Sequence, residues 1–168
     1  GRYSATLLPS WQTKTMKKIA LFVDVQNIYY TVKQERGCHF NYRELWRQLS
    51  CEGEIVSAYA YAIDRGDAQQ QGFQQILRNI GFEVKLKPYI QRHDGSAKGD
   101  WDVGLTIDVM DTFTVSETTA DCLVLLSGDG DFDMLLERVG RDFGASTIVY
   151  GIRSLTAASL INAATEFR

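Results

Sequence analysis

The sequence predicts an α/β fold in which a mainly parallel sheet of about five strands is covered by helices on both faces. Short apolar runs alternate along the chain with segments whose apolar residues recur at three- and four-residue spacing, the patterns of strands and amphipathic helices. A helix between successive strands brings the chain back, so that the next strand runs parallel to the last. No repeat or low-complexity linker divides the 168 residues, which is the length of one domain.

The first half of the chain contains three predicted strands, which are short apolar runs, and two predicted helices. Asn41 and Asp67 stand where an N-cap side chain would begin each helix, and Gly81 stands where the second helix would end. A loop is expected next, over 88–99. The strands cover 18–23, 55–63 and 82–86, and the helices cover 41–50 and 67–81.

The second half continues the same alternation of helices and strands. Gly144 closes the middle one of its three predicted helices. The helices cover 102–113, 132–143 and 156–164, and the strands cover 122–126 and 147–150. Residues 1–15 show neither a helical nor a strand period and are interpreted as an extension, which leaves 16–168 as the folded domain.

Charge and cysteine content limit the classes of function. The net charge of −3 gives no general attraction for nucleic acid, so affinity for a polyanion would need a local basic patch or a bound cation. No apolar run approaches the ~18 residues that span a bilayer, so no membrane association is expected. The odd cysteine count, without CxxC spacing, favours a reduced, cytoplasmic setting.

Three acidic segments are predicted to meet at one edge of the sheet. Asp24 ends the first strand, and Asp102 begins the helix before the fourth strand. Asp129 and Asp131 directly follow that fourth strand. In open parallel sheets, functional groups gather outside the carboxyl ends of the strands. The convergence of these segments is therefore the most informative feature of the sequence.

A cluster of carboxylates predicts a bound cation. Carboxylates packed together repel one another, and burial raises their pKa values, so the cluster is unfavourable unless a cation neutralises it. Oxygen ligands of this kind suit Mg²⁺ or Mn²⁺. His39 and His93 are the only histidines and lie outside the acidic segments, so a zinc site built on imidazole lacks ligands.

Each aspartate also has an ordinary structural explanation. A carboxylate at a helix start is more often an N-cap than a ligand, and Asp24 could cap a following helix. Asp100, Asp102 and Asp108 could form a solvated helix face. Asp102 and Asp108 lie about 240° apart around a helix at ~100° per residue, so they do not share a face. Taken together, the three segments favour a metal site over coincidence.

Three motifs occur in a fixed order along the chain. They are D-x-x-N at 24–27, a lysine and aspartates at 98–104 that continue to Asp108, and S-G-D-x-D-F at 127–132. With these residues in this order, the chain resembles the NYN domains, the LabA-like branch of the PIN-like nuclease superfamily. The resemblance covers about Lys17 to Gly151.

The resemblance implies a PIN-like three-layer α/β/α sandwich and metal-dependent hydrolysis of phosphodiester bonds, usually in RNA. It assigns catalysis and the binding of Mg²⁺ or Mn²⁺ to four carboxylates. Asn27 and Ser127 would support these ligands or position the substrate, and Lys98 would contact a phosphate or steady the carboxylates. The predicted ligands are Asp24, Asp102, Asp129 and Asp131.

The expected partner is RNA, although the chain shows no obvious appended RNA-binding domain. Trp101 and Tyr89 could stack on bases, and Asp108 could support the cluster from its rim. Two other functions stay open: a non-catalytic module that binds RNA or a protein, and a small-molecule phosphatase on the same carboxylates. A homodimer is also compatible with the sequence. The basic residues that could guide an RNA strand are Lys85, Lys87, Arg92 and Lys98.

Overall fold

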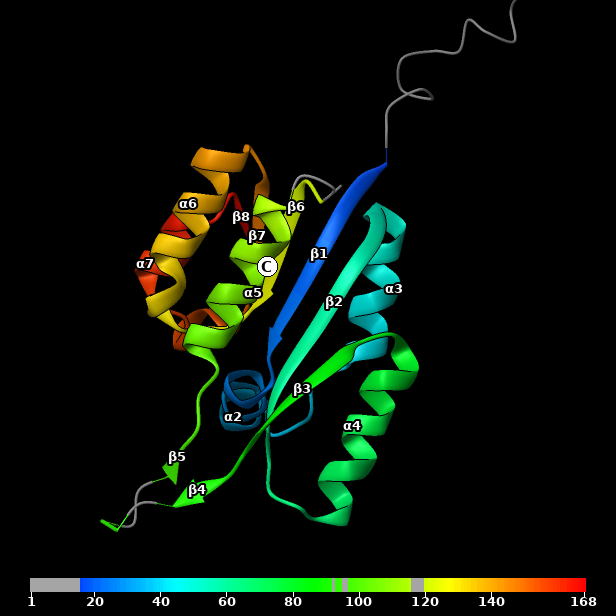
Figure 1. The fold of residues 1–168 in the computed structure, drawn as a ribbon, viewed down its shortest axis with the longest axis vertical. Helices are drawn as coiled ribbons and strands as arrows, with labels where there is room; N and C mark the ends of the chain where they lie inside the picture. The colour runs from blue at the N-terminus through cyan, green and yellow to red at the C-terminus, as the bar shows by residue number, and fades with distance from the viewer. Residues whose placement is uncertain (1–15, 92, 95–96, 116–119) are drawn as a thin grey trace, which may run out of the picture.

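A parallel sheet of six strands forms the middle layer of the protein, in the order β3-β2-β1-β6-β7-β8 (Figure 1). The computed structural model describes residues 16–91, 93–94, 97–115 and 120–168, and the predicted extension 1–15 lies outside this part. The predicted fold class is confirmed, with β8 added to the five expected strands. The strands are β1 (Lys17–Asp24), β2 (Gly53–Asp64), β3 (Glu83–Pro88), β6 (Cys122–Leu126), β7 (Ser146–Tyr150) and β8 (Glu166–Phe167).

The order of the strands reverses at β1. From β1 the chain builds outward through β2 to β3, then returns to β6 on the other side of β1 and builds outward again. β1 and β6 are paired with Val23 beside Leu126, so Asp24 and Ser127 follow at neighbouring strand ends. Ligands bind at such reversals in open sheets, because the connections on either side leave a crevice there.

The helices form two groups, one on each face of the sheet (Figure 1). One face is covered by α2 (Val25–Arg36), α3 (Tyr42–Glu52) and α4 (Ala68–Ile80). The other face is covered by α5 (Asp102–Thr114), α6 (Asp133–Phe143) and α7 (Ala158–Ala163), with the short turns η2 (Gly130–Phe132) and η3 (Arg153–Leu155). Among the described residues, no helix is long and apolar enough to cross a membrane.

Helix α2 is absent from the elements that the sequence predicts. Asp24 caps its first turn, so the strand runs into the helix with no loop between them. Two exposed tyrosines, Tyr29 and Tyr30, interrupt the amphipathic pattern, because an apolar-looking pair faces solvent. The buried positions keep helical spacing nonetheless and are Val25, Ile28 and Val32.

Side chains of β1 alternate between the two faces of the sheet. Leu21 and Val23 pack beneath α2, α3 and α4, whereas Ala20 and Phe22 pack beneath α5, α6 and α7. All four side chains are completely buried. Asp24 continues the second set, so its carboxylate is directed to the side of α5 and α6 and toward the end of β6.

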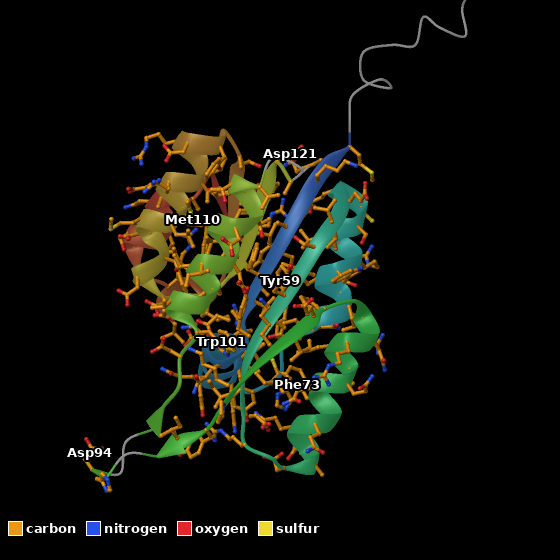
Figure 2. The ribbon with its side chains drawn as sticks, viewed as in Figure 1. Tyr59, Phe73, Asp94, Trp101, Met110 and Asp121 are labelled. Carbon is orange, nitrogen blue, oxygen red and sulfur yellow. The ribbon has the colours of Figure 1, made fainter. Side chains whose placement is uncertain are left out.

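Residues 88–99, which are predicted as a loop, contain a short hairpin. Strand β4 (Ile90–Gln91) pairs antiparallel with β5 (Ala97–Lys98). The hairpin extends away from the sheet, with Asp94 near its tip (Figure 2). Arg92 and the side chain of Lys98 lie outside the described residues, so their roles in binding RNA stay predictions.

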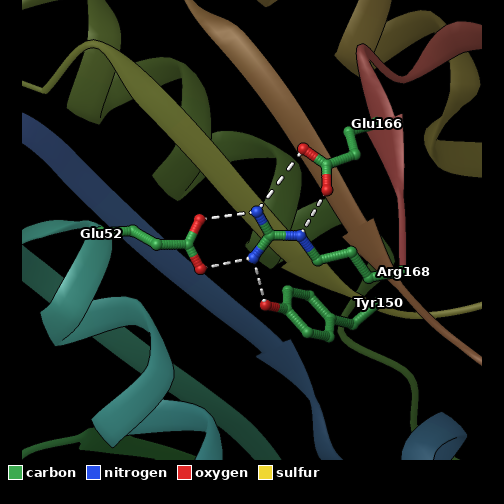
Figure 3. A network of polar contacts seen from close by, with 4 residues as sticks. All are labelled: Glu52, Tyr150, Glu166 and Arg168. Atoms are coloured by element: carbon green, nitrogen blue, oxygen red, sulfur yellow. Dashed lines mark hydrogen bonds and ion pairs between the residues drawn. The ribbon is translucent and has the colours of Figure 1, made fainter.

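The guanidinium group of Arg168 joins β8 to α3 and β7 (Figure 3). It donates to both carboxylate oxygens of Glu52, at 2.6 and 2.7 Å, and to the hydroxyl of Tyr150 at 2.7 Å. It also forms an ion pair with Glu166. Partly exposed ion pairs contribute only ~0–1 kcal/mol each, so the network mainly fixes the position of the short strand β8.

Candidate metal centre

Three carboxylates meet where the chain passes from β6 to α6 and where α5 begins. One oxygen from each of Asp102, Asp129 and Asp131 lies within 4.8 Å of the other two. Asp102 occupies the first position of α5, and the other two belong to the segment after β6. Residues far apart in sequence are thus brought together.

Asp24, at the end of β1, is outside this group of three but adjoins it through Ser127. One of its carboxylate oxygens accepts a hydrogen bond from the backbone N–H of Asn27 at 3.3 Å, which caps α2. Its other oxygen accepts from the hydroxyl of Ser127 at 3.3 Å. Asp24 therefore serves as an N-cap and also belongs to the acidic cluster, where Asp129 and Asp100 act on its charge.

The segment after β6 is held in place by its own polar groups and by α2. The hydroxyl of Ser127 accepts from the backbone N–H of Asp129 at 3.1 Å, and the N–H of Gly128 donates to the side-chain oxygen of Asn27 at 2.9 Å. Asp129 accepts from the N–H of Asp131 at 2.9 Å and so caps η2. Ser127 and Asn27 thus fix the backbone that presents the carboxylates.

Burial and neighbouring carboxylates disfavour the charged forms of Asp24 and Asp102. Burial raises the pKa of Asp24 to about 6 from its ordinary value of 3.8, although hydrogen bonds from Asn27 and Ser127 oppose the rise. Burial, a hydrogen bond with the Asp129 carboxyl group and repulsion from that group raise the pKa of Asp102 to about 7. Two carboxyl groups share a hydrogen bond only when one of them keeps a proton. A bound cation could take the place of that proton and offset the negative charge of the carboxylates.

No salt bridge between described residues involves any of the four carboxylates. The ligands on offer are carboxylate oxygens, with no imidazole or thiolate in the group. Hard cations such as Mg²⁺ and Mn²⁺ prefer oxygen ligands and complete their coordination with water. The residues present therefore fit a divalent cation of this class.

A family model described as the NYN domain matches residues 18–168. The chain belongs to the NYN domain family. It is 30% identical over 128 residues to the low amplitude and bright protein LabA of Synechococcus elongatus, a match that spans 71% of this chain and 66% of that protein. It also resembles the crystal structure of a protein of unknown function from Vibrio parahaemolyticus, with 47% identity, a TM-score of 0.83 and coverage of 92% of this chain and 93% of that one.

Asp108 lies outside the acidic cluster of this NYN domain. Its carboxylate accepts from the hydroxyl of Tyr61 at 2.8 Å and forms an ion pair with Lys85 at 2.6 Å. The Lys85 ammonium group therefore neutralises Asp108 on a different side of α5 from Asp102. The structure separates these two aspartates as their helical spacing requires, and it gives Asp108 a structural partner.

Asp100 and Trp101 surround the start of α5. Asp100 is exposed, and its carboxylate accepts from the backbone N–H of Asp102 at 3.1 Å, so it orders the turn that carries Asp102. The indole N–H of Trp101 donates to the backbone oxygen of Ala62 at 2.8 Å, and its ring packs against Tyr61. Trp101 thus anchors the start of α5 to the end of β2.

Glycine is required at position 128 of the NYN domain. A Cβ atom there would lie 2.5 Å from the backbone oxygen of Leu155, too close for either backbone segment to avoid moving. The Gly128→Ala variant is therefore expected to lose about 1–3 kcal/mol of unfolding free energy, the range for overpacked sites. Urea unfolding measures this loss. In the matched variant Gly72→Ala the added atom meets open space within α4, so stability should rise by up to about 1 kcal/mol. Equal stability of the two variants would contradict the argument.

The sequence did not predict a pocket beside the first turns of α2. Gln26, Tyr29 and Tyr30 line a pocket with Arg65 from the turn after β2. The adjacent tyrosines Tyr29 and Tyr30 could have indicated it, because two large aromatic side chains are seldom exposed side by side on a surface helix. It was hidden because α2 itself was not predicted.

Proposed function

We propose that this NYN domain is a metal-dependent nuclease that hydrolyses phosphodiester bonds of RNA. The observation that carries the proposal is the approach of three carboxylates, Asp102, Asp129 and Asp131, to within 4.8 Å of one another with no salt-bridging cation among the described residues. Membership of the NYN family supports it.

The four carboxylates would hold one or two Mg²⁺ or Mn²⁺ ions. A divalent cation supplies positive charge that activates water and offsets the charge that develops on phosphate oxygens. Asp102 and Asp24 have raised pKa values and give up protons when a cation binds, so metal affinity should increase with pH. Ser127 and Asn27 keep the ligand-bearing backbone in place before substrate arrives.

An RNA cleavage assay tests this proposal directly. Wild-type protein is incubated with end-labelled single-stranded RNA in Mn²⁺, in Mg²⁺ and in EDTA. We expect cleavage with either cation and none in EDTA. Calorimetric titration with Mn²⁺ in parallel shows whether the metal binds.

The parallel measurements separate the other candidate functions. Metal binding without cleavage of RNA or DNA would contradict the nuclease and favour a non-catalytic binding module. Hydrolysis of a phosphate monoester without cleavage of polynucleotides would favour a small-molecule phosphatase. Cleavage that persists in EDTA would contradict the role given to the carboxylates.

A further inference from the structure

A pocket of about 380 Å³ lies beside the first turns of α2. It is enclosed by α2, the segment between α2 and α3, the end of β2 and the start of α4. Much of its wall is aromatic, but amide and guanidinium groups also line it. Its lining includes Gln26, Tyr29, Tyr30, His39, Arg65 and Gln69.

The pocket and the acidic cluster share structural elements. Val25 and Gln26 line the pocket, whereas Asp24 and Asn27 on either side of them contact the segment after β6. The end of β2 is shared in the same way: Ala62 lines the pocket and its backbone oxygen holds Trp101 at the start of α5. A ligand that spans the first turn of α2 would therefore contact both sites.

Aromatic rings and one guanidinium group surround the mouth of the pocket. The side chains of Tyr29 and Tyr30 belong to residues that are 41% and 48% exposed, and the ring of Tyr29 stacks on His39 at 5.9 Å. The guanidinium group of Arg65 donates to the Tyr30 hydroxyl at 3.2 Å and lies 5.0 Å from the centre of the Tyr89 ring. The Lys33 ammonium group also lies over the Tyr29 ring, 5.5 Å from its centre, so Tyr30 is the more accessible of the two rings. A base could stack on Tyr30 while the Arg65 guanidinium group beside it binds a phosphate.

A second hollow lies beside Arg65, at the ends of β2 and β3. It is lined by Arg65, Lys87 and Tyr89, among others. The ammonium group of Lys87 lies 4.6 Å from the centre of the Trp101 ring and donates to the backbone oxygen of Asp100 at 3.0 Å. Cations and rings thus alternate from the start of α5 to the pocket.

The carboxylates beside Arg65 are engaged by the backbone. Asp64 accepts from the N–H of Gly66 at 2.9 Å, and Asp67 accepts from the N–H of Gln70 at 2.7 Å and caps α4. They shape the turn that carries Arg65 and leave its guanidinium group at the mouth of the pocket. Asp67 itself lines the pocket and Asp64 lines the hollow beside it, so the attraction for a phosphate comes from the guanidinium group of Arg65 and not from a net positive surface.

We propose that this pocket binds a nucleobase of single-stranded RNA, with Arg65 bound to a phosphate of the same strand. The inference rests on the proposed function, because it places the neighbouring phosphodiester of that strand at the carboxylates. Tyr30 supplies a stacking surface that accepts any base. The amide groups of Gln26 and Gln69 can bind the Watson–Crick edge of a base, which is accessible only where the RNA is unpaired.

Equilibrium binding in EDTA tests the pocket separately from cleavage. Fluorescence anisotropy measures the Kd of a short labelled single-stranded RNA at several salt concentrations. The Tyr30→Ala variant should bind about tenfold more weakly, since one stacked base is worth ~1–3 kcal/mol, and Tyr30→Phe should stay near wild type because it keeps the ring. Tyr30→Ala should leave the salt dependence unchanged.

Arg65 should act through charge. In Arg65→Ala, the slope of log Kd against log salt should fall by about 0.7, the value for one phosphate contact on a single strand. Arg78→Ala removes the same charge from an exposed position on α4 and should change neither slope nor affinity. Thermal unfolding of each variant checks that the fold is intact.

The outcomes are distinguishable. RNA binding that is absent, or that Tyr30→Ala and Arg65→Ala both leave unchanged, would overturn the pocket proposal even if the protein cleaves RNA. Binding that depends on both residues in a protein that never cleaves RNA would support the pocket and contradict the nuclease.

Discussion

Replacing Asp129 with asparagine is expected to reduce Mn²⁺-dependent cleavage of single-stranded RNA by at least about 100-fold, the upper end of the effect of losing a group that only supports a metal ligand. Asp129 is central to the acidic cluster, because its carboxyl group is hydrogen-bonded to that of Asp102 and lies within 4.8 Å of that of Asp131. An amide keeps the oxygen that caps η2, so the local backbone should be preserved. The rate of cleavage at saturating Mn²⁺ measures the effect.

The control for this variant is Asp111→Asn, which removes the same charge from an exposed position on α5. Asp111 lies about 13 Å along the helix axis from Asp102 at ~1.5 Å per residue, so it should not affect the metal. Thermal unfolding in EDTA should show that both variants are folded. Full activity of Asp129→Asn would remove the carboxylate cluster from the mechanism.

The Asp24→Asn variant is expected to be more stable than wild type in EDTA at about pH 8. The pKa of Asp24 is about 6 in the folded protein against an ordinary value of 3.8, so the folded state binds this proton more tightly. The resulting stability is fully present below the ordinary pKa and is lost as the pH rises through the folded value. The difference between the two pKa values corresponds to about 3 kcal/mol of unfolding free energy, which wild type loses when Asp24 ionises. The variant does not lose it, because an amide does not ionise.

Urea unfolding of wild type and Asp24→Asn at about pH 4.5 and pH 8 in EDTA measures this difference. The gap should open as the pH rises, while Asp111→Asn follows wild type at both values. Asp102, with a pKa raised to about 7, contributes to the pH dependence of both proteins in the same direction. Added Mn²⁺ should stabilise wild type much more than Asp24→Asn. A variant less stable than wild type at the higher pH would show that the buried carboxylate is already neutralised.

Most of the sheet and helices could be predicted because their signals are local. Asn41 and Asp67 cap α3 and α4 as predicted, through hydrogen bonds from the N–H groups of Glu44 at 3.0 Å and Gln70 at 2.7 Å. The apolar run over 122–126 forms the completely buried strand β6. The meeting of the acidic segments follows from the parallel order of the strands, which places their carboxyl ends at one edge.

The partners of individual side chains could not be predicted, because they depend on packing between distant segments. Asp108 forms an ion pair with Lys85, 23 positions away, and accepts a hydrogen bond from the hydroxyl of Tyr61, 47 positions away. Helical spacing separates Asp108 from Asp102 but does not say which of them faces the acidic cluster. The pocket beside α2 is built by elements that are separate in sequence, and no single segment carries its pattern.

The two outer strands of the sheet have a consequence for self-association. On one side the sheet ends at β3, which carries charged side chains at every second position, Glu83, Lys85 and Lys87. The strand finishes in Pro88, which has no N–H to donate. On the other side β8 is two residues long and offers few backbone groups to an incoming strand. Neither margin is a good template for adding a strand from another molecule. The sheet should therefore resist growth into intermolecular β-structure.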